Sequence, residues 1–229
     1  MSCSVSGIGL AGFGTVGSGV WKILEEHGGL IESRSQGSAV MKIRKIGVRD
    51  LSKKREGSAP AELFTTNLME VVEDPSVDIV VELIGGTEAA FHFVAEALKA
   101  GKPVVTGNKA LLAERGTELF AISKETNTPI YFEAAVAGGI PIIKAVQQSL
   151  VGNQIESIAG IINGTSNYIL QRMTEAGLGY PEALKEAKDL GYAEADETLD
   201  VNGWDAAHKA ILLGSIAHGF LINYKNVYV

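Results

Sequence analysis

Short apolar runs alternate with segments of helical periodicity along the first part of the chain. Mostly apolar runs are typical of strands buried on both faces, whereas apolar residues three and four apart are typical of an amphipathic helix. Helices are expected over 16–26 and over 89–100, where Gly101 follows at a position suited to a left-handed cap. Strands are expected at 5–10, 43–48, 78–84, 103–106 and 129–132.

This alternation predicts the fold class. Strands that alternate with helices imply right-handed crossovers and a parallel sheet with helices on both faces. Residues 1–137 are therefore expected to form a Rossmann-type, doubly wound α/β domain that binds a dinucleotide.

The pattern changes after the glycine-rich step at 137–141. A strand at 158–162 and a strand-like end at 226–229 are expected in this part, separated by helical patterns. The helices are expected near 167–176, 181–190 and 204–221. Residues 138–229 are thus expected to form a second, α+β substrate domain.

Composition narrows the class of protein. The 229 residues carry a formal net charge of −7, which argues against nucleic acid as a partner. The only cysteine, Cys3, leaves no internal disulfide and no cysteine metal cluster. No leader and no apolar run of the roughly 20 residues that span a bilayer is found, so a cytoplasmic protein without a membrane partner is expected.

The motif Gly-Phe-Gly-Thr-Val-Gly lies between the first expected strand and helix. In this context Gly12 allows the turn, Gly14 lets a pyrophosphate approach the backbone, and Gly17 lets helix and strand pack closely. A purely structural turn is the alternative. The expected cofactor-binding residues of the motif are Gly12, Phe13, Gly14, Thr15, Val16 and Gly17.

The end of the second strand bears on which nicotinamide cofactor binds. An acidic residue there holds the ribose 2′-hydroxyl of NAD, whereas an arginine suits the 2′-phosphate of NADP. Arg49, with the basic run 53–55 after it, favours NADP. Asp50 directly follows and could still bind a hydroxyl, and a solvated surface loop over 51–61 is the alternative.

Two lysines are candidates for chemistry. Lys109 follows the strand 103–106, at the sheet edge where ligands of open α/β folds bind, although a surface charge is its default interpretation. Asp205 and Lys209 stand four residues apart on one helical face, as in a plain surface ion pair. The apolar run 210–217 predicts that their helix is buried, and a partly desolvated lysine is suited to proton transfer.

Five segments together resemble homoserine dehydrogenase over essentially the whole chain. They are Gly-Phe-Gly-Thr-Val-Gly at 12–17, Gly-Asn-Lys-Ala at 107–110, Glu-Ala-Ala-Val-Ala-Gly-Gly-Ile-Pro at 133–141, Asn-Gly-Thr-Ser-Asn-Tyr-Ile at 163–169 and Gly-Tyr-Ala-Glu-Ala-Asp at 191–196. The stretch 191–209 is the most specific, because Glu-Ala-Asp, then Asp, then Asp-x-x-x-Lys is close to the family signature.

The resemblance implies the reversible reduction of L-aspartate 4-semialdehyde to L-homoserine with NADPH or NADH, a step toward threonine, methionine and isoleucine. It assigns proton transfer to Lys209, assisted by Lys109, and the substrate ammonium group to Glu194. It also implies that Gly191, Thr165 and Asn163 face the substrate pocket, and that Asp200 and Asp205 orient the substrate or the catalytic Lys209.

The resemblance further implies a homodimer and a monovalent cation, usually sodium. The cation would bind the backbone carbonyls of Glu133, Val136, Gly138 and Ile140, for which a hinge without an ion is the alternative. Family members continue past residue 229, so a truncated substrate domain is expected, and activity of this chain stays open.

Two other functions compete with this one. A phosphorylating semialdehyde dehydrogenase needs a cysteine nucleophile, and Cys3 precedes the first expected strand. A dinucleotide-binding fragment or sensor without turnover would keep the glycine motif alone.

Overall fold

The computed structural model describes residues 5–35, 40–53, 55, 59–193 and 198–229. The chain divides into two compact units, Met1–Ala135 and Val136–Val229. The boundary expected from the sequence, between residues 137 and 138, lies two residues further along the chain.

The first unit is built on one parallel sheet whose strands follow the order β3-β2-β1-β4-β5-β6. The order reverses between β1 and β4, and ligands of doubly wound sheets bind at such a switch point. The α/β Rossmann-type class predicted from the sequence is confirmed. The strands are β1 (Val5–Ala11), β2 (Val40–Gly47), β3 (Phe64–Thr65), β4 (Ile79–Glu82), β5 (Val104–Thr106) and β6 (Ile130–Tyr131).

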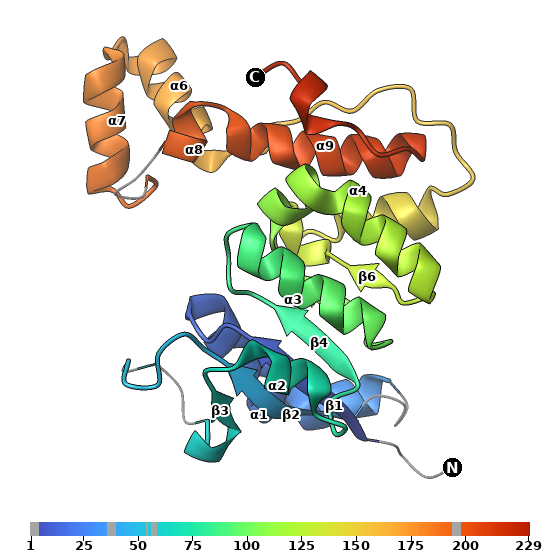
Figure 1. Ribbon diagram of the computed structural model, residues 1–229. Helices are drawn as coiled ribbons and strands as arrows, with labels where there is room; N and C mark the ends of the chain where they lie inside the picture. The colour runs from blue at the N-terminus through green and yellow to red at the C-terminus, as the bar shows by residue number, and fades with distance from the viewer. Residues whose placement is uncertain (1–4, 36–39, 54, 56–58, 194–197) are drawn as a thin grey trace. The chain divides into compact units, whose positions relative to one another are not determined.

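Helices cover both faces of this sheet. Ile8 and Leu10 of β1 are buried against α1, whereas Gly9 between them faces α2, where an added Cβ would lie 2.5 Å from Val71. Helix α3 packs beside α2, and α4 beside α3 (Figure 1). The helical segments are α1 (Thr15–Arg34), η1 (Ala61–Leu63), α2 (Leu68–Glu73), α3 (Glu88–Lys99), α4 (Lys109–Thr126) and η2 (Glu133–Ala135).

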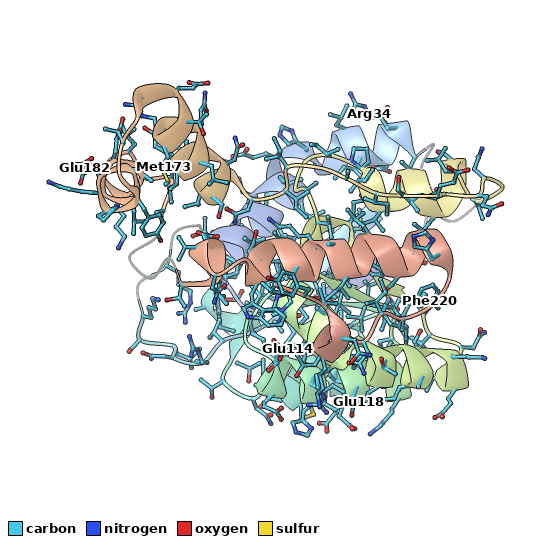
Figure 2. All side chains as sticks on the ribbon, turned by 90° about the horizontal axis from the view of Figure 1, so that it is seen from above. Arg34, Glu114, Glu118, Met173, Glu182 and Phe220 are labelled. Carbon is cyan, nitrogen blue, oxygen red and sulfur yellow. The ribbon has the colours of Figure 1, made fainter. Side chains whose placement is uncertain are left out.

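All the regular secondary structure in the described residues of the second unit is helical. Helices α6 and α7 lie side by side, as Figure 2 shows around Met173 and Glu182, and they bury Ile169 against Ala183 and Ala187. The helical segments are α5 (Ile142–Lys144), η3 (Ala145–Ser149), α6 (Gly164–Ala176), α7 (Tyr180–Asp189), α8 (Thr198–Val201), α9 (Trp204–His218) and η4 (Tyr224–Asn226).

The sequence predicted two strands in this unit, and both predictions are wrong. Residues 158–162 form no strand, and Ile161 is 78% exposed. Residues 226–229 form no strand either, because residue 226 is the last residue of the short helix η4 and residues 227–229 are irregular. A strand needs a paired neighbour for its backbone hydrogen bonds, and no described residue of the unit provides one. The described part therefore lacks the sheet that an α+β domain implies.

The long helix of the second unit ends earlier than expected. Helix α9 stops at His218 because Gly219 adopts φ +72°, a left-handed cap. Gly101 caps α3 in the same conformation, as expected from the sequence. Among the helices of the described residues, none has the length and apolar character needed to cross a membrane.

Candidate functional site

The three glycines of the 12–17 motif meet three different surroundings. Gly12 adopts φ +97°, and a Cβ there would lie 2.5 Å from the carbonyl oxygen of Leu83. A Cβ on Gly17 would lie 2.2 Å from the carbonyl oxygen of Gly12. A Cβ on Gly14 would meet no atom within 4 Å. The first and third glycines are thus required by the fold, while the second leaves its backbone open to a ligand.

The start of α1 is suited to an anion. Gly14 is the N-cap of this 20-residue helix, no side chain caps the helix, and its first turn contains no acidic residue. The amides of a helix's first turn lack intrahelical acceptors and carry a partial positive charge. A pyrophosphate group fits this end of the helix.

A cleft of about 850 Å³ opens at the carboxyl ends of β1, β2 and β4. Of the expected cofactor-binding residues, Val16, Gly17 and Lys109 are not among the described residues that line it. The lining residues are Gly12, Phe13, Gly14, Thr15, Ser18, Val48, Arg49, Asp50, Lys53, Arg55, Thr66, Leu68, Leu83, Ile84, Gly85 and Ala89. A dinucleotide is the kind of ligand that such a switch-point cleft binds.

The end of the cleft next to β2 is basic. Arg49, Lys53 and Arg55 line it, and the Arg55 guanidinium lies 5.7 Å from the centre of the Phe64 ring. Asp50 lies among them, with Oδ1 accepting hydrogen bonds from the Ser52 amide at 2.8 Å and the Ser52 hydroxyl at 2.7 Å. These hydrogen bonds, with the charges of Arg55 and Lys53, hold the pKa of the Asp50 carboxyl below its usual value.

Lys109 is half-buried and is the first residue of α4, just after the carboxyl end of β5. Asn108 is the N-cap of this helix, and its Oδ1 accepts the Leu111 amide at 3.1 Å. Lys109 thus belongs to the first unit, and Lys209 to the second. The cap fixes where the Lys109 backbone lies.

The ammonium group of Lys209 is held by two acceptors in the second unit. Its Nζ donates to Oδ2 of Asp205 at 2.6 Å and to the carbonyl oxygen of Ile162 at 2.6 Å. The side chains of Lys209 and Asp205 are 19% and 10% exposed. The partial burial of this pair, expected from the apolar run that follows it, is confirmed.

Asn163 connects the carboxylates of this network. Its Nδ2 donates to Oδ1 of Asp200 and to Oδ2 of Asp205, at 2.9 Å each, while its Oδ1 caps α6 by accepting the Ser166 amide at 2.7 Å. Thr165 Oγ1 lies 3.2 Å from Oδ2 of Asp200. The structure therefore gathers Asn163, Thr165, Asp200, Asp205 and Lys209 into one polar cluster.

Other expected substrate residues lie beside this cluster or outside the described chain. Thr165 Oγ1 donates to the carbonyl oxygen of Tyr192 at 2.6 Å, next to Gly191, whose φ is +77°. Glu194 lies outside the described residues.

The four carbonyls expected to bind a monovalent cation are divided between the units. Glu133 belongs to η2 of the first unit, whereas Val136, Gly138 and Ile140 belong to the second. Within the second unit a tight turn closes with the Ile140 amide donating to the carbonyl oxygen of Ala137 at 2.8 Å. Ala137 adopts φ +51° there.

Sequence reasoning missed one buried polar side chain near the cleft. Glu82, at the carboxyl end of β4, is fully buried and accepts a hydrogen bond from the Thr106 hydroxyl at 2.6 Å. The apolar run around it predicts only a buried strand. A single carboxylate within such a run is the signal that could have identified it.

Family models match both parts of the chain. The model described as "Homoserine dehydrogenase, NAD binding domain" matches residues 12–133, and that described as "Homoserine dehydrogenase" matches residues 141–229. The homoserine dehydrogenase of Bacillus subtilis (strain 168) is 46% identical over 222 residues, which cover 97% of this chain and 51% of the relative. The chain spans about half the length of the curated relatives it matches.

Solved structures agree with these matches. A homoserine dehydrogenase from Thiobacillus denitrificans superposes with a TM-score of 0.89 at 46% identity, covering 98% of this chain and 52% of that one. A hyperthermophilic archaeal homoserine dehydrogenase, solved in complex with NADPH, has a TM-score of 0.80 at 27% identity, covering 98% and 75%. The chain belongs to the homoserine dehydrogenase family, and its first unit is a nicotinamide dinucleotide-binding domain.

Proposed function

We propose that this chain catalyses the reversible reduction of L-aspartate 4-semialdehyde to L-homoserine with a nicotinamide dinucleotide. The observation that carries the proposal is the Lys209 ammonium group, partly buried and held by Asp205 and the Ile162 carbonyl. The same chain, a member of the homoserine dehydrogenase family, also has a cleft suited to a dinucleotide. An acid that can deliver one proton and a cofactor that can deliver one hydride are together sufficient to reduce an aldehyde.

The dinucleotide, when bound, supplies the hydride for the aldehyde carbon. Lys209 donates one proton to the aldehyde oxygen, so that the carbonyl gains both hydrogens of the alcohol and the lysine becomes a neutral amine. Two of the three ammonium N–H bonds have acceptors among the described residues, and the third can donate to the substrate oxygen. In the oxidation direction the amine removes the hydroxyl proton.

The surrounding residues orient this lysine. Asp205 keeps Nζ at a fixed point, and Asn163 keeps Asp205 and Asp200 together through the two hydrogen bonds of its amide nitrogen. In this proposal Lys109 is the second cation that stabilises the developing negative charge. Glu194, Gly191, Asp200 and Thr165 bind the substrate.

NADP is the cofactor that we propose the chain prefers. Arg49, Lys53 and Arg55 line the end of the cleft next to β2, where the adenosine ribose binds in this fold. The only carboxylate lining that end within the described residues, Asp50, is engaged by the amide and hydroxyl of Ser52. An engaged carboxylate beside three cations favours a 2′-phosphate over a 2′-hydroxyl.

Three further expectations rest on the family resemblance: the role of the reaction in threonine, methionine and isoleucine formation, the homodimer, and the cation at the 133–140 carbonyls. The cytoplasmic location is a fourth, and it rests on the sequence composition. Each remains a prediction.

The test is an assay of NADPH oxidation on addition of L-aspartate 4-semialdehyde, with the Bacillus subtilis relative as positive control. We expect turnover by the wild-type chain, a loss of at least about a hundredfold in kcat for Lys209→Met, and unchanged NADPH affinity in that variant. Equal kcat in wild type and Lys209→Met would reject the role of the lysine. NADPH binding without turnover by the wild type would favour the dinucleotide-binding fragment or sensor instead.

A further inference from the structure

We infer that Glu82 is a positioning residue for the nicotinamide half of the dinucleotide, acting through a ring of hydrogen bonds that joins the loops after β4 and β5. The inference rests on the proposed function only in requiring that the cleft bind a dinucleotide. Glu82 does not line the cleft, and its side chain is fully buried.

Both carboxyl oxygens of Glu82 have donors. Oε1 accepts the Ile84 amide at 2.9 Å, and Oε2 accepts the Thr106 hydroxyl at 2.6 Å. A buried carboxyl group is costly, and an apolar side chain of similar volume is often as stable or more stable at such a site. Core stability alone therefore does not account for a glutamate among the valines of β4.

The hydrogen bonds continue from Thr106 and close into a ring. Thr106 Oγ1 accepts the Asn108 amide at 2.9 Å, and Asn108 Nδ2 donates to the carbonyl oxygen of Gly86 at 2.7 Å. Gly86 lies two residues after Ile84, whose amide returns to Glu82. The ring thus ties the start of the loop that runs from β4 to α3 (Figure 1) to the N-cap of α4.

This ring supports the wall of the cleft at β4. Ile84 and Gly85 line the cleft, and a Cβ on Gly85 would meet no atom within 4 Å, so its backbone is open to a ligand. Gly85 and Gly86 adopt φ +71° and +72°. Glycine enters and leaves this conformation at little steric cost, so the neighbouring hydrogen bonds restrict which backbone conformation the loop adopts.

Topology indicates which part of the dinucleotide meets this wall. The adenosine half binds toward β2 and the pyrophosphate at the glycine turn between β1 and α1, so the nicotinamide half extends across the switch point toward β4. Glu82 is therefore expected to influence one half of the ligand and not the other.

Glu82→Gln tests the ring while keeping the shape of the side chain. If the glutamine NH2 group faces Ile84, two donors face each other and that hydrogen bond is lost. If it faces Thr106, it donates to the second lone pair of Oγ1, which already accepts the Asn108 amide, and the buried hydroxyl proton loses its acceptor. The ring is broken in the first arrangement and keeps an unsatisfied hydroxyl proton in the second.

The measurement is the Kd of the 229-residue chain for a whole dinucleotide and for its adenosine half. The probes are NADPH with 2′,5′-ADP, or NADH with 5′-AMP if the wild type binds NADH more tightly. We expect Glu82→Gln to raise the Kd for the dinucleotide about tenfold or more and to change the Kd for the adenosine half less than twofold. Glu96→Gln, an exposed carboxylate on α3, is the matched control and should change neither.

Thr106→Val and Thr106→Ser keep the inference testable if Glu82→Gln fails to fold. Thr106→Val should weaken the dinucleotide selectively, and Thr106→Ser, which restores the hydroxyl, should recover the wild-type Kd. Equal weakening of both ligands would mean a general structural role and would overturn the inference, as would no weakening at all. A wild type that binds neither dinucleotide would instead overturn the proposed function.

Discussion

Lys209 Nζ lies 2.6 Å from Oδ2 of Asp205, one helical turn away, in a pair whose side chains are 19% and 10% exposed. Lys22 and Glu26 of α1 have the same spacing of four residues, but they lie 3.9 Å apart and are 70% and 54% exposed. Identical spacing therefore yields a partly desolvated pair in one helix and a solvated pair in another. The difference lies in which face of the helix carries the pair: Lys209 and Asp205 face the segment of Ile162 and Asn163, whereas Lys22 and Glu26 face solvent.

Asp205→Asn should lower the free energy of unfolding of the second unit by about 2 kcal/mol, because it leaves a partly buried ammonium group without its carboxylate. Glu26→Gln, the matched change in the exposed pair, should cost less than about 0.5 kcal/mol. Urea unfolding at pH 7 measures both. Trp204 fluorescence in a Trp21→Phe background reports the second unit, and Trp21 in a Trp204→Phe background reports the first. Equal costs for the two variants would contradict the prediction.

Gly14→Ala and Gly17→Ala should have opposite consequences. Gly14 has φ −86° and open space beside it, so alanine should preserve the melting temperature but weaken dinucleotide binding at least about tenfold. Alanine at Gly17 meets the carbonyl oxygen of Gly12, so it should lower the free energy of unfolding by about 2 kcal/mol or more. Helix propensity alone would make Gly17→Ala stabilising by about 1 kcal/mol, so the sign of the change is decisive.

Arg49→Ala should change the choice of cofactor. Loss of the guanidinium should raise the Kd for NADPH about tenfold and leave that for NADH within about twofold, because only NADPH carries the 2′-phosphate. Fluorescence titration of both dinucleotides measures the ratio. Lys42→Ala, which removes an exposed cation of β2 outside the cleft lining, is the control. An unaltered ratio in Arg49→Ala would reject the 2′-phosphate assignment.

Glu186 should make the stability of the α6–α7 hairpin depend on pH. Hydrogen bonds from Arg172 Nε at 3.0 Å and the Tyr168 hydroxyl at 2.9 Å lower the pKa of this carboxyl in the folded protein. A lowered folded-state pKa stabilises above the unfolded-state value of about 4.3, and this contribution is lost as pH falls through the folded-state value.

The urea midpoint reported by Trp204 should therefore decline below about pH 4.3, and Glu186→Gln should make that decline shallower. Glu175→Gln, a change in the same hairpin, is the control. The same slope in Glu186→Gln and wild type would show that Glu186 does not contribute.

Periodicity predicted the Rossmann-type unit because its strands are continuous apolar runs separated by amphipathic helices. It missed β3 and α2 since these elements are two and six residues long, too short to establish a period. It wrongly predicted a strand at 158–162, because an apolar run does not reveal whether a partner strand is available.

Part of the candidate site was accessible from the sequence. The glycine turn and the Asp205–Lys209 pair are local patterns, so spacing alone identified them. The ring through Glu82, Thr106 and Asn108 joins positions 24 and 26 residues apart, and only the pairing of β4 with β5 brings them together. Topology, rather than local spacing, determines such contacts.

The closed ring of Glu82, Thr106 and Asn108 has an evolutionary consequence. Each of its side chains satisfies a polar group that would otherwise be left without a partner, so losing one member removes the reason to retain the others. Across descendants of a common ancestor, these three positions should therefore change together rather than one at a time. Lineages that abandon the ring should fill position 82 with an apolar residue and inherit a different loop after β4.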